Sequence, residues 1–310
     1  MPSIHVPVLV DQVVSLLAGV EAGLLVDATV GLGGHARALL SANPGFRLLG
    51  IDRDPAALEV AQQRLASFEN RVHLVHSEFS SVPQILSEIG ESPVAILADL
   101  GCSSLQLYRS ERGFSFASDG PLDMRMGREG RSAAELVNEA DEEELVRILR
   151  QYGEERRAKA IARAIVGRRQ EHFFETTGDL SRLIIDILGQ RPDRIHPATR
   201  SFQAFRIAVN DELGELERFL EPSIRTLKPG GRIGVISFHS LEDRIVKHTL
   251  RRLEGHCTCP SGFPVCACSP ERVVRVLTKK VVRPDATETS ENPRSRSSRF
   301  RAAERVGGDS

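Results

Sequence analysis

Acidic and glycine residues follow two apolar runs near the start of the sequence. Asp27 ends the first run and is followed by Gly31, Gly33 and Gly34, and Asp52 ends the second run. Glycine lets a ligand approach the backbone, because it carries no Cβ and adopts positive φ at little cost. An acid after the second strand of such a unit accepts hydrogen bonds from ribose hydroxyls. The pattern therefore predicts a pocket for a cofactor that contains adenosine.

The spacing of the glycines leaves open which cofactor binds. Residues from Gly31 to Ala36 fit the G-x-G-x-x-G/A pattern of dinucleotide-binding turns. Asp27 is poorly placed beside a pyrophosphate, but it suits a cationic amine or sulfonium. S-adenosylmethionine carries those cations and no phosphate, and we therefore favour it. In the structural alternative, Asp27 caps the turn and Asp52 caps the helix that begins at Pro55.

Parallel strands alternating with helices are expected to position these residues. The expected strands are rich in Val, Ile and Leu with little polar alternation, as in strands covered on both faces: 24–30, 46–54, 71–76 and 93–100. Helical spacing of apolar residues lies between them, at 35–42, 55–68 and 80–89. This order predicts an α/β fold with a twisted parallel sheet and helices on both faces.

The strand pattern stops after Asp99 and resumes near Gly230. Between these points, a polar loop precedes helical patterns such as 153–169, which has one apolar stripe. We therefore expect a helical insertion at 105–212, which recognises the substrate and splits the cofactor-binding α/β domain.

That split domain is expected to comprise residues 1–104 and 213–310. Within its second part, 273–278 and 298–306 are predicted to add the last strands of the sheet. Residues 287–296 are predicted to form a mobile connection because they are polar and lack apolar periodicity.

The N-terminal segment carries no sign of a targeting or membrane sequence. Residues 1–14 lack a basic lead, and Asp11 and Gln12 interrupt their apolar run. We therefore expect a cytoplasmic protein that does not associate with a membrane. Its 310 residues suffice for one or two domains.

Four of the five cysteines lie close together in the sequence. Cys257-x-Cys259 and Cys266-x-Cys268 offer four thiolates, which suffice for one tetrahedral zinc ion. C-x-C pairs are less usual in zinc sites than C-x2-C pairs, and the prolines between them are typical of a surface turn. We therefore expect reduced thiols and no metal.

Positive charge is concentrated in the last part of the chain, although the net charge is only −1. From Arg244 to Val306 there are 14 Lys and Arg residues against 6 Asp and Glu residues. Such an excess can contact phosphate groups, and an ordinary solvated surface is the alternative.

Specific motifs are spread over most of the chain. They are HVPVL at 5–9, DATVGLGGH at 27–35, GIDRDPAAL at 50–58, LADLGCSSLQL at 97–107, RGFSF at 112–116, GPLDMRM at 120–126, YGEE at 152–155, PATRSFQAFRIAVNDEL at 197–213, ISFHSLEDRIVK at 236–247 and ENPRSRSS at 291–298. Together they resemble the bacterial methyltransferase family that modifies the N4 amino group of a cytosine in 16S ribosomal RNA.

This resemblance implies a class I methyltransferase (Rossmann-like) fold, with an antiparallel C-terminal strand in the sheet and an inserted all-α substrate domain. It implies S-adenosylmethionine as the methyl donor and 16S rRNA within the small ribosomal subunit as the partner. The residues that it places against the cofactor are Gly33, Gly34, His35, Asp52, Phe79, Asp99 and Gln106, to which the glycine turn adds Gly31. We expect His35 to contribute its backbone N–H at a helix start and not an acid–base imidazole, and Phe79 to pack on adenine or in the core.

The cytosine amino group is a weak nucleophile, because its lone pair is delocalised into the ring. An acceptor for its N–H groups helps to localise that lone pair, and Asp99 is the first candidate. Asp123 and Arg125 are placed near the substrate as further catalytic candidates, with a structural salt bridge as the alternative. Many amino methyltransferases have Asp-Pro-Pro-Tyr at this point, whereas this chain has Asp-Leu-Gly-Cys. Phe114 and Phe116 are therefore candidates for stacking on the base, with burial as the alternative.

Two other functions stay open on the sequence alone. One is a nicotinamide-dependent oxidoreductase, and the other is a non-catalytic ribosome-assembly or RNA-binding factor that retains the pocket. The target nucleotide, the choice between naked RNA and an assembled subunit, and the oligomeric state stay open too, with a homodimer as one alternative.

Overall fold

The computed structural model describes residues 7–127, 129–190, 195–257, 259 and 270–307. The chain forms two compact units, which are described separately below. The sheet unit comprises Met1–Gly101 and Leu213–Ser310, and the helical unit comprises Cys102–Glu212.

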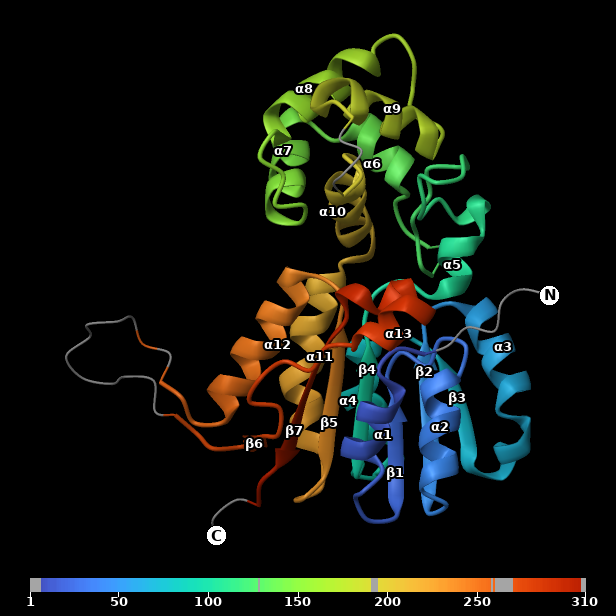
Figure 1. The fold of residues 1–310 in the computed structure, drawn as a ribbon, viewed down its shortest axis with the longest axis vertical. Helices are drawn as coiled ribbons and strands as arrows, with labels where there is room; N and C mark the ends of the chain where they lie inside the picture. Colours follow the sequence, from blue (N-terminus) through green and yellow to red (C-terminus); the bar gives the residue numbers. More distant parts are fainter. Residues whose placement is uncertain (1–6, 128, 191–194, 258, 260–269, 308–310) are drawn as a thin grey trace. The chain divides into compact units, whose positions relative to one another are not determined.

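Seven strands among the described residues form one sheet in the order β3-β2-β1-β4-β5-β7-β6 (Figure 1). They are β1 (Gly23–Asp27), β2 (Phe46–Asp52), β3 (Val72–His76), β4 (Ala95–Asp99), β5 (Arg232–Ser237), β6 (Val274–Val276) and β7 (Arg299–Arg305). The first five are parallel, β7 is antiparallel to β5, and β6 is antiparallel to β7. The predicted α/β class, with a mostly parallel sheet and an antiparallel C-terminal strand, is confirmed.

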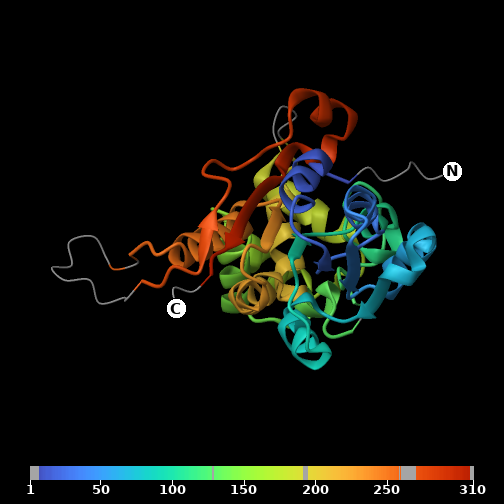
Figure 2. The ribbon, with the colours of Figure 1, turned by 90° about the horizontal axis from the view of Figure 1, so that it is seen from below.

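Helices cover both faces of this sheet (Figures 1 and 2). The helices α1 (Val10–Leu17), α2 (Gly34–Ala42) and α3 (Pro55–Arg64) contribute to one apolar cluster. The helices α4 (Val82–Ile89), α11 (Glu212–Thr226) and α12 (Ser240–Leu253) contribute to the other. Burial on both faces explains why β1 and β4 read as continuous apolar runs. The 3-10 turns η1 (Ala66–Arg71) and η2 (Phe79–Ser81) flank β3.

The expectation of a mobile connection at 287–296 is wrong. These residues form most of α13 (Ala286–Glu291) and η4 (Pro293–Ser297). Asp285 caps α13 by accepting a hydrogen bond from the N–H of Glu288 at 2.8 Å. The Glu288 carboxylate accepts a hydrogen bond from the Leu9 N–H at 2.7 Å. The polar composition of this segment therefore gives no indication of the helix, which is stabilised by its cap and by a long-range contact.

The helical unit contains α5 (Ser104–Tyr108), η3 (Ser110–Arg112), α6 (Ala133–Glu139), α7 (Glu142–Gln151), α8 (Ala158–Arg168), α9 (Thr177–Leu188) and α10 (Thr199–Asn210). It has an apolar core of its own. The stripe predicted within 153–169 is buried at Ala158, Ile161, Ala162 and Ile165. Over the described residues, every helix is too short or too polar to traverse a lipid bilayer.

Candidate cofactor-binding and active site

Three carboxylates stand at the carboxyl ends of neighbouring strands in the sheet unit. Asp27, Asp52 and Asp99 are the last residues of β1, β2 and β4, and β1 lies between the other two strands. Parallel strands end at one edge of a sheet, where ligands of such folds bind. The observed strand boundaries therefore place these three acids at strand ends, as predicted.

The turn after β1 is bonded to the second strand. The Gly31 N–H donates to Asp52 Oδ2 at 2.8 Å, and the Asp54 N–H donates to Asp52 Oδ1 at 2.9 Å. Gly31 and Gly33 have φ of +50° and +76°, so this turn needs glycine. Gly33 is the N-cap residue of α2, and the turn therefore leads directly into a helix N-terminus.

Asp52 does not cap the helix that begins at Pro55. That cap is Asp54, whose Oδ1 accepts a hydrogen bond from the N–H of Ala56 at 3.1 Å. The structural alternative for Asp52 is therefore wrong. A carboxylate has about four lone-pair sites, so Asp52 retains acceptor capacity beyond its two backbone bonds.

Burial makes these acids hard to ionise in the absence of a cation. It raises the pKa of Asp27 to about 7, with His35 acting in the opposite direction. Burial and the nearby Glu242 raise the pKa of Asp99 to about 7. Burial also raises the pKa of Asp52 to about 6, although backbone hydrogen bonds from Asp54 and Gly31 oppose the shift. A positively charged ligand would stabilise all three carboxylates, whereas a pyrophosphate would repel them.

The imidazole of His35 belongs to this site, a feature that sequence patterns did not indicate. Its backbone lies at the start of α2, but its ring is buried, with Nε2 2.8 Å from the Val8 carbonyl oxygen. Its Nδ1 lies 3.5 Å from Oδ2 of Asp99. Because a carbonyl only accepts, Nε2 carries the hydrogen and a neutral ring turns its Nδ1 lone pair toward Asp99. Burial lowers the pKa of His35, which favours that neutral ring.

Asp99 presents a buried acceptor that has no partner. Its backbone N–H donates to Thr29 Oγ1 at 2.7 Å, which fixes the start of the loop after β4. Its Oδ1 is buried without a hydrogen bond in the described part of the chain, while the side chain as a whole is 22% exposed. A buried unpaired acceptor is unfavourable. An ammonium or amino group in the crevice would satisfy this atom.

Glu242 is a further acid that the motif analysis did not single out. It is only 2% exposed and accepts hydrogen bonds from the backbone N–H groups of Phe238 and His239, at 2.8 and 3.2 Å. His239 is the N-cap residue of α12, so the two form a capping box. The spacing of His239 and Glu242 matches that motif except for histidine at its first position. Glu242 acts on the site by raising the pKa of Asp99.

Phe79 follows β3 at the same edge of the sheet. Its ring packs edge-on against Phe219, with 5.3 Å between ring centroids and an interplanar angle of 82°. The side chain is partly buried against the apolar core. Phe79 therefore has the core contact that was the alternative to stacking, and adenine stacking stays a prediction.

The other predicted site residues lie in the helical unit. Gln106 is 3% exposed and forms a capping box with Ser103, accepting from its N–H at 3.0 Å. Asp123 and Arg125 form a bidentate pair, with Nε–Oδ1 and Nη2–Oδ2 distances of 3.0 and 2.7 Å. Burial opposes ionisation of Asp123, but hydrogen bonds from Arg125 hold its pKa below the usual range. The salt bridge that was the structural alternative is therefore present.

The two phenylalanines considered for base stacking have partners inside the helical unit. Phe114 is 8% exposed and lies beneath the Arg112 guanidinium at 5.9 Å, so the burial alternative holds for it. Phe116 is partly buried and stacks on His196 at 4.3 Å, with an interplanar angle of 16°. One face of the Phe116 ring is therefore occupied.

The cysteine cluster is described only in part. Cys257 and Cys259 form no disulfide with the described residues, and the Cys259 N–H donates to Cys257 Sγ at 3.4 Å. Cys266 and Cys268 lie outside the described residues. The expectation that these four cysteines bind no metal stays a prediction.

Sequence comparisons give consistent matches over nearly the whole chain. A family model described as the MraW methylase family matches residues 2–306. A "Ribosomal RNA small subunit methyltransferase H" from Geobacter sulfurreducens is 50% identical over 307 residues, covering 97% of this chain and 99% of the relative. A protein of the same name from Symbiobacterium thermophilum is 48% identical over 303 residues, covering 96% of this chain and 95% of the relative.

Proposed function

The chain belongs to the MraW methylase family, and on that premise we propose that it transfers a methyl group from S-adenosylmethionine to the N4 amino group of a cytosine in 16S rRNA. The printed name of its relatives supports ribosomal RNA of the small subunit as the substrate. The observation that carries the proposal is the set of three carboxylates, Asp27 buried and Asp52 and Asp99 partly buried, at neighbouring strand ends beside a glycine turn.

The charge of these three carboxylates fits S-adenosylmethionine better than a dinucleotide. Asp27, Asp52 and Asp99 concentrate negative charge where a ligand would lie, which suits the sulfonium and ammonium groups. Asp52 would accept hydrogen bonds from the ribose hydroxyls. The backbone N–H groups of Gly34 and His35 would line the cofactor at the N-terminus of α2, where intrahelical partners are lacking. Gly33 would line it through its backbone alone, because its N–H donates to the Val30 carbonyl at 2.8 Å.

Two further residues extend this proposed cofactor site. Phe79 would lie against the adenine, because it follows β3 at the same edge of the sheet. Gln106 is assigned to the cofactor on the resemblance of its motif, and its capping box would hold the side chain in position.

The bound cofactor supplies an electrophilic methyl group with a neutral sulfur leaving group. In the in-line displacement, the carbon–nitrogen bond forms as the carbon–sulfur bond breaks, and the amino nitrogen becomes positive before it loses a proton. The protein must chiefly align the two reactants and exclude water. The unpaired Oδ1 of Asp99 would accept an N–H from the amino group and localise its lone pair. Asp99 would then accept the released proton, because its pKa is raised to about 7.

The helical unit is proposed to recognise the RNA. A base within folded RNA must leave its stack to reach the methyl group, so the enzyme needs a surface that holds the RNA around that base. The pair of Asp123 and Arg125 would shape the loop that approaches the substrate, since Arg125 also donates to the Gly130 carbonyl at 3.1 Å. The small ribosomal subunit is the proposed partner, and the cytoplasm is the proposed compartment.

Mass spectrometry of 16S rRNA tests this function. We expect RNA from cells lacking this chain to have lost a single N4-methylcytidine, which returns when the wild-type chain is supplied. If the N4-methylcytidine content is the same with and without the chain, the proposed reaction is wrong.

A further inference from the structure

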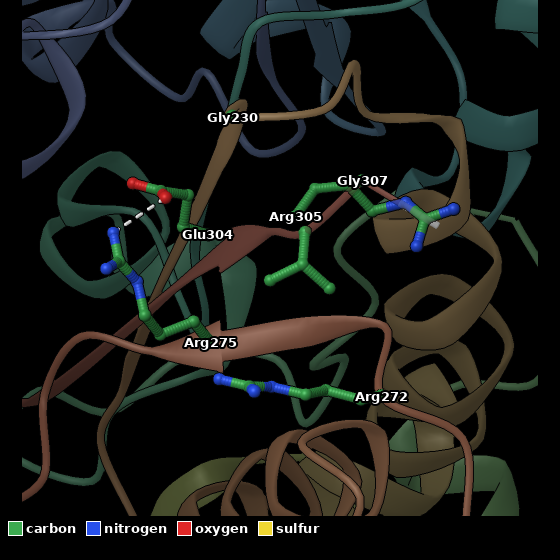
Figure 3. Close-up of a pocket in the computed structure, with 7 residues that line it drawn as sticks. Gly230, Arg272, Arg275, Glu304, Arg305 and Gly307 are labelled. Atoms are coloured by element: carbon green, nitrogen blue, oxygen red, sulfur yellow. Dashed lines mark hydrogen bonds and ion pairs between the residues drawn. The ribbon is translucent and has the colours of Figure 1, made fainter. Parts of the chain in front are cut away.

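A hollow lies in the sheet unit, away from the glycine turn. It has a volume of about 430 Å³ and is lined by Gly230, Arg272, Arg275, Glu304, Arg305, Val306 and Gly307. Figure 3 shows the side chains of Arg272, Arg275 and Arg305 coming from neighbouring segments around it, with Arg275 paired to Glu304. We call it the arginine pocket.

The arginine pocket and the three carboxylates lie at opposite ends of the parallel strands. Gly230 precedes β5, and Arg305 is the last residue of β7, which runs antiparallel to β5. Both positions are at the amino ends of the parallel strands, whereas Asp99 is at a carboxyl end. A strand of six residues such as β5 rises roughly 20 Å. The two sites are therefore separate features of one unit.

Positive charge exceeds negative charge around the arginine pocket. Its lining includes three arginines and one glutamate. Glu304 already accepts hydrogen bonds from two arginines, from Nη2 of Arg275 at 2.8 Å and from Nε of Arg232 at 3.1 Å. The neighbouring Glu271 is paired with Arg225 at 2.9 Å. The carboxylates near the pocket are therefore engaged, and the arginine excess is not neutralised.

Two of the arginines retain donors for a ligand. Arg305 uses one terminal nitrogen to donate to the Val273 carbonyl at 3.2 Å, but its Nε is buried with no partner in the described part of the chain. The Arg272 side chain is exposed and makes no hydrogen bond or ion pair with the described residues. The planar fork of arginine donors matches phosphate oxygens in geometry and charge.

We propose that the arginine pocket binds a backbone phosphate of the RNA substrate. The inference rests on the proposed function, because it takes a structured RNA as the ligand. An RNA in a ribosomal subunit is large enough to contact the sheet unit at both ends of its strands, whereas a mononucleotide is not. Phosphate contacts of this kind fix the position of an RNA without reading its sequence.

Salt dependence of RNA binding is the test. Fluorescence anisotropy of a labelled oligouridylate is measured with the full chain between about 50 and 200 mM NaCl, because each phosphate contact contributes about 0.7 to the slope of log affinity against log salt. We expect R272Q, which removes the guanidinium that makes no hydrogen bond or ion pair with the described residues, to lower this slope by about 0.7, so that the wild type loses about 2.6-fold more affinity over the range. The double variant R272Q/R275Q should lower the slope by the same amount, because the pocket holds one phosphate.

A matched control distinguishes RNA binding at the arginine pocket from the general effect of removing a positive charge. Arg47 lies near the start of β2, at the same sheet edge, is 56% exposed and pairs with Glu91. We expect R47Q to leave the slope unchanged. An unchanged slope in R272Q/R275Q, or an equal reduction in R47Q, overturns the proposal. The affinity of each variant for S-adenosylhomocysteine shows whether it is folded. If the double variant is unfolded, the slope measured with R272Q alone tests the proposal.

Two further measurements distinguish RNA from a small anion as the ligand of the arginine pocket. If inorganic phosphate binds the wild type but not R272Q/R275Q in calorimetry, while the oligouridylate slope stays unchanged, the pocket takes small anions and the RNA proposal is wrong. With small subunits as the substrate, we expect R272Q/R275Q to raise KM several-fold and to leave kcat unchanged. A wild-type chain that binds RNA with the expected slopes but transfers no methyl group refutes the proposed function and not the pocket.

Discussion

Three carboxylates at neighbouring strand ends, one buried and two partly buried, make the proposed cofactor site sensitive to pH. The pKa values of Asp27 and Asp99 are about 7 in the absence of a ligand, against an ordinary value of 3.8. Between pH values of about 4 and 7 the native state therefore binds more protons than the unfolded chain. These two groups consequently lower the free energy of unfolding as pH rises through this window. A bound cation favours the ionised forms and releases protons.

We predict that affinity for S-adenosylmethionine rises about tenfold between pH 6 and pH 8, because a carboxyl group with a pKa near 7 goes from mostly protonated to mostly ionised. Calorimetry at several pH values, in buffers of different ionisation enthalpy, measures both the affinity and the protons released. The variant D99N should flatten the curve. An affinity that does not vary with pH in the wild type would show that these acids do not face the cationic groups.

Replacing Asp99 by Asn should separate chemistry from cofactor binding. We predict that D99N lowers kcat by roughly 10²- to 10³-fold, as expected for loss of a positioned proton acceptor. Its affinity for S-adenosylhomocysteine should change less than about tenfold, because the amide keeps the shape of the carboxylate. Single-turnover methyl transfer and calorimetry give the two values. Undiminished methyl incorporation by D99N would remove Asp99 from the reaction.

At the scale of residues, sequence patterns locate the acids but not their partners. Asp27, Asp52 and Asp99 were predictable because each ends an apolar run that forms a strand. The contact of His35 with Asp99 was not predictable, because it joins a helix to a strand more than sixty residues away in the chain.

At the scale of elements, the turn between β1 and α2 depends on the conformation of its glycines. Gly33 has φ of +76°, and a Cβ there would lie 3.3 Å from Leu65 Cγ and 3.4 Å from Ala61 Cα. Gly90, which ends α4, has a similar φ of +73°, but a Cβ there would meet nothing within 4 Å. Comparing alanine substitutions at these two glycines therefore separates the effect of backbone strain from the effect of displacing the turn.

We predict that G33A and G90A each lower the free energy of unfolding by about 1 kcal/mol or more, through the left-handed conformation alone. G33A should also weaken S-adenosylhomocysteine binding at least tenfold, because α2 must shift away from α3, whereas G90A should leave it unchanged. Denaturant unfolding and calorimetry measure the two effects. Equal binding by G33A and the wild type would place the cofactor away from this turn.

The strands and most helices were predictable because their apolar spacing is regular. The segment 287–296 was not, because its helix depends on the cap from Asp285 and the contact between Glu288 and Leu9. The loop that holds Asp123 and Arg125 has no periodicity, so only coordinates show that these two side chains pair.

At the scale of the whole molecule, the two units have separate cores and are expected to have separate tasks. Asn210 holds the loop of the helical unit. Its Oδ1 accepts from the Met126 N–H, and its Nδ2 donates to the Met124 carbonyl, both at 2.8 Å. Met124 has φ of +62°, an unusual value for a side chain of this kind, and these bonds support it.

We predict that N210A lowers the stability of the helical unit by about 2–4 kcal/mol, because it leaves buried backbone groups unpaired. Methylation of small subunits should fall, while affinity for S-adenosylhomocysteine stays unchanged, since the cofactor residues of the sheet unit are untouched. Thermal unfolding and calorimetry test this division. A loss of cofactor affinity as large as the loss of methylation would contradict this division.

The central claim is that this chain moves a methyl group from S-adenosylmethionine to the N4 amino group of a cytosine in 16S rRNA. The most direct measurement incubates the purified chain and deuteromethyl-labelled S-adenosylmethionine with small subunits from cells that lack the chain, followed by mass spectrometry of the nucleosides. We expect the label to appear in N4-methylcytidine, and D99N to abolish most of it. Label in another nucleoside, or none in RNA from any form of the subunit, would show that the chain does not catalyse this reaction.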